Sequence, residues 1–429
     1  TRITRTLQTR GEPVVQLAFS RSGRLVAASD GNGWVRLWSL ESGDLLAKFG
    51  GTEESSGWLY NVLQISDDET RLLVRTGYSV KMYRIPEGKE LWMAPPKQMA
   101  TFALSPNGKT VCASSFTGQA TSLYDAETFQ RPVPLEQTKD MGFPAYEARF
   151  TFSPDSRILA LASPKGKVNF FDSATGKQLA ARSTEDEELL HLGYTEDGTF
   201  LITVNRGKAF LFDAIRFEKL AEAPFDVTKY WRYGAATPGG AEKQLTLFRP
   251  ADLPKGDLEA CWKKLESSRP TEVLEAMWQM SEAADLGPFL RAKVPPVAAP
   301  DGDEVRKLIG NLDSRTFAAR EAAGRKLDEL GRPAEPFLRQ ALKGGLSAEA
   351  AERARRLLAD LQRPYTPEEV RQRRLIFALE TSGTAGARRT LESWAAGAAG
   401  AHLTEQSKQA LGRLGEVPGA IPRPRAQPR

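Results

Sequence analysis

The first 250 residues repeat one pattern five times, and this repeat limits the possible folds more than any other feature. Each copy reads as an apolar strand, a polar turn, an apolar strand, a second turn and an aromatic-rich strand. We call the last residue of each first strand its anchor. The anchors are Ser20, Ser66, Ser105, Ser153 and Thr195, separated by 46, 39, 48 and 42 residues. Short strands at such regular spacing indicate an all-β array.

The residues around the anchors fit strands joined by tight turns. Each anchor is followed by turn-forming residues, as in Pro106-Asn107-Gly108, whose backbones adopt turn angles easily. The third strand of each copy ends in an aromatic residue: Trp38, Tyr83, Tyr124, Phe171 and Phe212. A period of about 40–45 residues is that of a four-stranded propeller blade. The repeat therefore predicts five complete blades of a β-propeller.

Two segments resemble the WD-repeat consensus. Residues 30–43 read DGNGWVRLWSLESG and residues 165–176 read KGKVNFFDSATG. Asp follows the third-strand aromatic residue in three copies, as Asp125, Asp172 and Asp213. The resemblance covers residues 13–225, but no Gly-His dipeptide precedes any copy. The histidine network of the strongest WD repeats is thus missing, and we expect the blades to pack through apolar contacts.

A sixth copy is degraded. Residues 228–249 end in Leu245-Thr246-Leu247-Phe248, which fits a third strand, but the preceding stretch is too short for two strands. The turn at 237–240 fits either the first turn or the loop after the second strand. Residues 1–10 have the place of an outermost strand before the first blade. They either close a small ring or belong to a blade that is partly missing.

After Pro250 the composition changes to Ala, Leu, Arg and Glu, which favour helices. Apolar residues recur at helical spacing, as in Ala387, Leu391 and Trp394. The sequence Thr366-Pro367 with Glu369 predicts a capped helix start, and Ser347 is another candidate cap. The motif at 288–291 returns at 336–339, and residues 366–396 form a looser third copy. These helix pairs resemble HEAT or armadillo repeats, which stack into solenoids.

The expected organisation has four parts. Residues 1–250 form the propeller, 251–299 the first helical pair and a Pro-rich linker, 300–414 HEAT-like repeats, and 415–429 a disordered basic tail. The whole arrangement resembles uncharacterised bacterial WD-repeat proteins with a C-terminal helical region. The short connection after 250 predicts that a helix at 256–267 packs on the degraded blade through Trp262.

Few residues suit catalysis or metal binding. The chain has two histidines, His191 and His402, and two cysteines, Cys112 and Cys261, without metal-ligand spacing. The glycines at 31 and 33 lie between two strands, so a hairpin explains them better than a phosphate-binding loop. We therefore expect neither an enzyme nor a cofactor, and a structural role for these four side chains.

Charge and hydropathy argue against two classes of partner. The net charge of +5 is small for 429 residues and gives no nucleic-acid footprint. Basic clusters at 353–356 and 371–374 lie beside glutamates, which favours ion pairs within the helices. No run of residues is long and apolar enough for a membrane span. A cytoplasmic location is expected, although the chain begins with Thr and its natural start is open.

The leading functional hypothesis is a scaffold or sensor that binds other proteins, with oligomeric state left open. One alternative is the regulatory region of a larger signalling protein that has lost its catalytic domain. Another is a propeller enzyme, such as a hydrolase or a quinone-dependent oxidoreductase, for which no polar pocket is visible. The candidate partner-binding residues are aromatics expected on one rim of the propeller: Trp34, Trp58, Tyr78, Phe116, Phe143 and Tyr146. Aromatic residues in loops are frequent interface hot spots, although packing between blades would also explain them.

Overall fold

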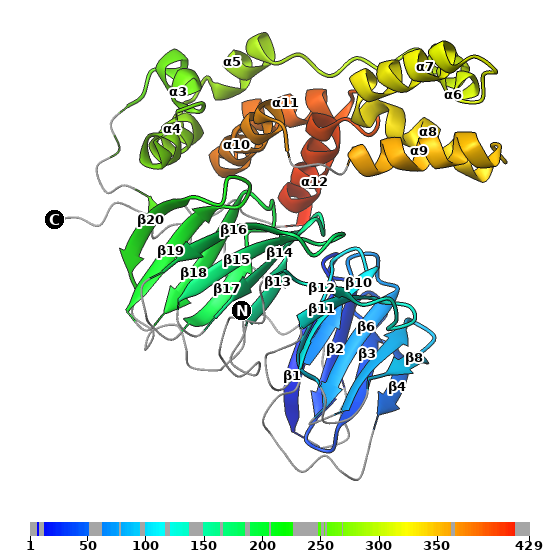
Figure 1. Ribbon diagram of the computed structural model, residues 1–429. Helices are drawn as coiled ribbons and strands as arrows, with labels where there is room; N and C mark the ends of the chain where they lie inside the picture. Colours follow the sequence, from blue (N-terminus) through cyan, green and yellow to red (C-terminus); the bar gives the residue numbers. More distant parts are fainter. Residues whose placement is uncertain are drawn as a thin grey trace. The chain divides into compact units, whose positions relative to one another are not determined.

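The computed structural model shows strands in the first half of the chain and helices in the second (Figure 1). It describes residues 7, 13–50, 62–76, 79–94, 99–115, 121–136, 149–163, 166–184, 189–205, 207–225, 248–249, 253, 255–267, 269–361 and 365–416. Two compact units divide the chain, Thr1–Phe248 and Arg249–Arg429. We refer to them as the propeller unit and the helical unit.

Five four-stranded antiparallel sheets make up the propeller unit, and we number them as blades in chain order. Blade 1 contains β1 (Val14–Phe19), β2 (Leu25–Asp30), β3 (Trp34–Ser39) and β4 (Leu45–Gly50). Blade 2 contains β5 (Val62–Ile65), β6 (Arg71–Thr76), β7 (Ser79–Arg84) and β8 (Lys89–Met93). Blade 3 contains β9 (Met99–Leu104), β10 (Thr110–Ser115), β11 (Thr121–Asp125) and β12 (Val133–Pro134). Blade 4 contains β13 (Arg149–Phe152), β14 (Ile158–Ala162), β15 (Lys167–Asp172) and β16 (Gln178–Ser183), and blade 5 contains β17 (Leu189–Tyr194), β18 (Phe200–Asn205), β19 (Lys208–Asp213) and β20 (Lys219–Pro224).

Within each blade the strands follow one another in chain order, and the first strands of successive blades contact each other. These contacts run from β1 through β5, β9 and β13 to β17, so the first strands are the inner strands. The prediction of five complete four-stranded blades is confirmed. The degraded sixth copy lies outside the described residues apart from Phe248 and Arg249.

The anchor hydroxyls explain why the first turn of every blade forms. In blade 3, Ser105 donates to Asn107 Oδ1 at 2.8 Å and accepts the Thr110 amide at 2.9 Å. Asn107 Oδ1 in turn accepts the Lys109 amide at 3.0 Å. The equivalent hydroxyls accept the amide five residues later in every blade: Ser20, Ser66, Ser153 and Thr195. All five anchors are buried. Each hydroxyl therefore accepts a backbone amide of its turn that would otherwise lack a hydrogen-bond partner.

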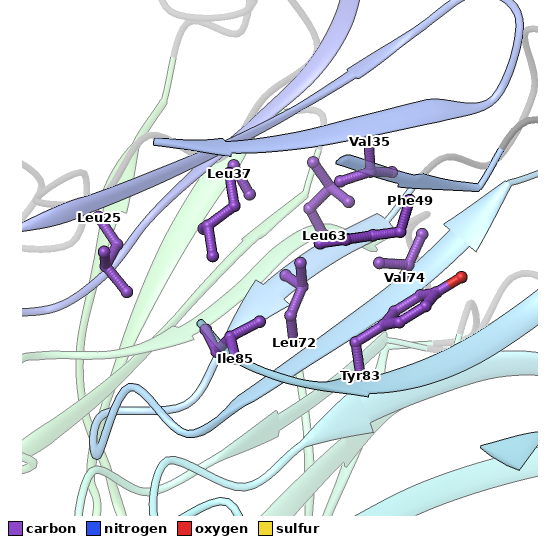
Figure 2. Packing of buried hydrophobic residues seen from close by; sticks show 10 residues of the cluster. Leu25, Val35, Leu37, Phe49, Leu63, Leu72, Val74, Tyr83 and Ile85 are labelled. Atoms are coloured by element: carbon purple, nitrogen blue, oxygen red, sulfur yellow. The ribbon is translucent and has the colours of Figure 1, made fainter. Parts of the chain in front are cut away.

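The third-strand aromatic residues of blades 2 to 5 pack between blades. Tyr83 of blade 2 stacks on Phe49 of blade 1, with 4.4 Å between the ring centroids. Figure 2 shows the cluster that surrounds this contact, with Val35 and Leu37 of blade 1 facing Leu72 of blade 2. Tyr124, Phe171 and Phe212 hold the same place between the later blades. Blade packing is apolar, as the missing Gly-His dipeptides led us to expect.

The helical unit contains ten α-helices within the described residues. They are α3 (Leu258–Lys264), α4 (Pro270–Glu282), α5 (Leu286–Lys293), α6 (Gly302–Asn311), α7 (Phe317–Leu330), α8 (Glu335–Lys343), α9 (Ala348–Asp360), α10 (Pro367–Ser382), α11 (Ala385–Ala395) and α12 (His402–Glu416). A short 3-10 helix, η4 (Arg332–Ala334), precedes α8. No strand occurs among the described residues from 255 to 416, in agreement with the prediction. Helix α12 extends two residues into the tail predicted to be disordered, and residues 417–429 lie outside the described part.

The order of packing in the helical unit differs from the order along the chain. Helix α4 packs against α10, and α5 against α11, while α6 to α9 share a separate core. The buried Trp394 indole of α11 donates to the Val294 carbonyl at the end of α5, with 2.8 Å between Nε1 and O. In a simple solenoid each repeat contacts its neighbours in the chain. These contacts therefore do not establish a HEAT-like solenoid.

Two predicted helix caps are present. Thr366 and Glu369 form a reciprocal capping box before α10, with Pro367 in the first turn. Ser347 Oγ accepts the Ala350 amide at 3.2 Å before α9. These hydrogen bonds satisfy amides that a helix start leaves without partners inside the helix. Local capping chemistry was thus readable from the sequence.

Candidate interaction surfaces of the propeller

The strand order gives each blade two different ends. In an antiparallel meander, the turn after the first strand and the turn after the third strand lie at the same end. We call this end of the propeller unit the turn face. The opposite end carries the connections after the second strand and the connections between blades, and we call it the loop face.

Hydrogen bonds link neighbouring turns on the turn face. Arg21 binds the Asp67 carboxylate at 2.7 Å, and the Asp67 amide donates to the Pro106 carbonyl, also at 2.7 Å. The Asn107 amide donates to Ser156 Oγ at 3.0 Å. Arg21 also reaches the Glu196 carbonyl of blade 5 at 3.1 Å. The first turns are thereby connected from blade 1 to blade 4 and from blade 5 back to blade 1.

Charges on the turn face are paired across blades. Glu127 of blade 3 binds both Arg71 and Arg84 of blade 2. Glu69 of blade 2 binds Arg24 of blade 1 at 2.6 Å. Burial raises the pKa of Asp67, opposed by the hydrogen bond and the positive charge of Arg21. The side chains of these turns thus serve contacts within the propeller.

Of the six predicted partner-binding residues, the structure describes one, Trp34. Trp34 was expected in a loop, but it is the first residue of β3, because it pairs with Gly50 at the end of β4. Its ring is half-buried, and Lys48 Nζ lies 3.7 Å from its centroid. The other five lie outside the described residues: Trp58, Tyr78, Phe116, Phe143 and Tyr146.

Two glycines determine the backbone conformation beside Trp34. Gly50 has a φ of +88°, and a Cβ there would lie 2.5 Å from the Gly33 carbonyl oxygen. Only glycine permits both this angle and this approach. Gly33 also closes the hairpin between β2 and β3, with its amide bonded to the Asp30 carbonyl at 3.1 Å. The glycines near 31–33 thus shape a hairpin, as predicted, whereas sequence reasoning missed the role of Gly50 and Lys48.

The candidate catalytic residue types lie in packed surroundings. His191 is on β17, and its pKa is lowered by burial and by the charge of Arg149. Burial raises the pKa of the Cys112 thiol on β10, which disfavours the nucleophilic thiolate. Cys261 donates to Gln279 Oε1 at 3.2 Å inside the helical unit. Among the described residues no group of His, Cys, Asp and Glu side chains could hold a metal ion.

The basic clusters of the helical unit are engaged in ion pairs and packing. Arg353 binds Glu321 at 3.0 Å and Glu349 at 3.2 Å. Arg374 is buried and donates to the Leu265 carbonyl at 2.6 Å. The Arg353–Glu349 pair is an ion pair within α9, as expected, whereas the bonds to Glu321 and Leu265 join different segments of the helical unit.

Trp262 packs inside the helical unit. Its ring meets Phe289 of α5 edge to face at 6.3 Å between centroids, and Arg371 of α10 lies 4.9 Å from it. Arg371 also binds Glu266 and Glu368. Apart from Phe248 and Arg249, the degraded blade to which Trp262 was expected to dock lies outside the described residues. No helix in the described part of the chain is long and apolar enough to span a bilayer.

Several solved structures resemble part of this chain at low sequence identity. No family model and no curated protein matches the chain. The β-propeller domain of Cps50 (Swd1) from Myceliophteria thermophila is 20% identical, with a TM-score of 0.42 over 52% of this chain and 74% of that one. A functionally unknown protein from Desulfotomaculum acetoxidans is 13% identical, with a TM-score of 0.41 over 51% and 72%. The designed protein Ika8 is 18% identical, with a TM-score of 0.41 over 51% and 63%.

Proposed function

We propose that this chain is a non-enzymatic scaffold that binds a protein partner on the loop face of its propeller. A propeller presents a rigid rim whose connections vary independently of the blades. The observation that carries the proposal is the contrast between the two ends. Turn-face side chains are paired across blades, whereas Trp34 presents a half-buried ring beside Lys48 at the loop end.

An aromatic ring beside a cation suits protein recognition. Trp and Tyr contribute large contact areas at low cost in conformational entropy and dominate interface hot spots. Five more aromatic residues are expected on the same rim from the repeat: Trp58, Tyr78, Phe116, Phe143 and Tyr146. The partner is therefore expected to offer a surface that accepts several aromatic side chains. The same surface would serve if the chain is the regulatory region of a larger signalling protein.

A pull-down with the full chain, followed by binding measurements with the protein it captures, tests the proposal. The variant Trp58→Ala plus Phe143→Ala should lose that binding at least tenfold with little change in melting temperature. Arg24→Ala is the matched control, because this side chain is 67% exposed on the turn face. An aromatic variant that binds as tightly as the wild type, or that unfolds, contradicts a loop-face site. Loss of binding in Arg24→Ala would place the partner on the turn face instead.

A further inference from the structure

The helices of the helical unit fall into two groups that pack separately (Figure 1). Helices α6 to α9 surround one apolar core, to which each helix contributes: Val305, Leu327, Leu338 and Ala354. Helices α4, α5, α10, α11 and α12 pack among themselves, with α3 on α4. We call the first group, residues 302–361, the arm and the second group the base. Because the arm has a core of its own, its folding does not depend on one orientation relative to the base.

An ion pair connects the arm to the base. Arg332 lies in η4 of the arm, and its Nε donates to Glu369 Oε1 of α10 at 2.6 Å. The two side chains are only 20% and 14% exposed. The guanidinium of Arg332 also lies 5.9 Å from the ring centroid of Tyr365, which precedes α10. Solvent ions screen a partly buried pair weakly, and removing one charge leaves the other without its partner.

The backbone of the arm meets the base at the same residue. A Cβ on Gly400, just before α12, would lie 2.7 Å from the Arg332 carbonyl oxygen and 3.1 Å from Pro336 Cδ. Gly400 also has a φ of +83°, so both the angle and the close approach require glycine. Its amide donates to Glu405 Oε1 at 3.1 Å, which fixes the loop before α12. The side chain and the main chain of Arg332 therefore both contact the base.

Glu369 joins this contact to the start of α10. Its Oε2 accepts the Thr366 amide at 2.8 Å, which completes the capping box, while its Oε1 accepts Arg332. The neighbouring Tyr365 ring meets the imidazole of His402 at the start of α12, with 5.2 Å between the ring centroids. The base thus holds the acceptor of Arg332 in place by contacts of its own.

We propose that the Arg332–Glu369 pair is a latch, and that the arm turns on the base as a rigid body when this latch opens. Two connections join the arm to the base, one after α5 and one before α10. On the first, the Val297 carbonyl accepts the Ala398 amide at 2.8 Å, so this connection is fixed to the base as far as Val297. The hinge therefore lies at residues 298–301, where α6 begins. Relative motion is expected of folded parts unless their interface is large and hydrophobic.

The distance between two spin labels tests the latch in the full chain. The labels are attached to p-acetylphenylalanine at positions 356 on α9 and 389 on α11, where the native arginines are exposed. The wild-type chain should give one narrow distance distribution by double electron–electron resonance. Arg332→Gln should broaden this distribution about twofold or add a second population. Glu369→Gln should have the same effect, because glutamine at this position retains the capping box and removes only the charge.

Arg339→Gln is the matched control, because the ion pair of this arginine with Glu335 lies within α8. It should leave the distance distribution unchanged. Gly400→Ala opens the latch without a change of charge, since the new Cβ must displace the Arg332 carbonyl, and it should broaden the distribution as well.

Two results would overturn the proposal. The first is a wild-type distribution in both Arg332→Gln and Glu369→Gln, which would mean that other contacts hold the arm. The second is loss of helix content in these variants, measured by circular dichroism, because the pair would then belong to one shared folded core. The test concerns the helical unit alone, so failure of the loop-face proposal would leave the latch standing, and the reverse also holds.

Discussion

The guanidinium of Arg21 in blade 1 donates a hydrogen bond to the main-chain carbonyl of Glu196 in blade 5, with 3.1 Å between Nη2 and O. The same side chain binds Asp67 of blade 2 at 2.7 Å. One arginine thus connects three blades on the turn face. Both side chains of the ion pair are about one-third exposed, so solvent screens their attraction.

A double-mutant cycle on this pair should give a small but measurable coupling. Arg21→Ala and Asp67→Asn are made singly and together, and the free energy of unfolding is measured in urea. We expect a coupling of about 0.2–1 kcal/mol, the usual range for partly exposed ion pairs. Strictly additive single variants would show that the pair contributes nothing to the stability of the turn face.

The anchor hydroxyls should contribute more to the free energy of unfolding than surface hydroxyls do. Ser105→Ala removes a buried group that bonds Asn107 Oδ1 and the Thr110 amide. Leaving buried partners unsatisfied costs about 1–3 kcal/mol, so the free energy of unfolding should fall by that amount. Ser42→Ala, in an exposed turn, is the control and should change it by less than about 0.5 kcal/mol. Equal effects of the two substitutions would refute the role of the anchors.

His191 predicts a dependence of stability on pH. Its pKa is lowered from 6.5, mainly by burial and also by Arg149. The unfolded chain therefore binds more protons than the folded chain once the pH falls below about 6.5. The free energy of unfolding should decrease from pH 7.5 to pH 5.5, and His191→Gln should flatten part of this decrease. Identical pH profiles of wild type and variant would contradict a partly buried His191 whose pKa is lowered in the folded chain.

Two glycines test the packing order of the helical unit. A Cβ on Gly287 of α5 would lie 2.4 Å from the Gly386 carbonyl oxygen of α11. Gly287→Ala should therefore destabilise the unit by about 1–3 kcal/mol through overpacking. Gly324 lies inside α7, and a Cβ there would meet nothing within 4 Å. Gly324→Ala should stabilise by about 0.5–1 kcal/mol. If both substitutions stabilise, α5 does not approach α11 this closely.

The blade repeat was predictable because its determinants are local. Ser105 and Asn107 sit in one turn, and the aromatic residue that ends each third strand recurs in phase. The same phase identifies which side chains face the preceding blade, although the sequence alone did not reveal that Leu17 and Phe19 stay exposed. The exposure of a side chain depends on which residues pack over its strand. A periodic sequence pattern does not identify those residues.

The helical unit shows the limit of periodicity more clearly. The stripe that contains Trp394 predicts a helix with one buried face, and α11 has that face. It does not reveal that the indole meets the Val294 carbonyl, 100 residues earlier in the chain. Trp34 shows the same limit on the propeller, since pairing with Gly50 makes it part of a strand. Partners distant in the chain decide these positions.

Hydrogen exchange of the full chain, with and without the captured protein partner, tests the scaffold proposal most directly. The proposal predicts slower exchange in loop-face peptides that contain residues 51–61 and 137–148. Peptides of the turn face, such as the one around Arg21 and Asp67, should be unchanged. Protection on the turn face with none on the loop face would contradict the account, because the partner would then bind the end whose side chains are already paired.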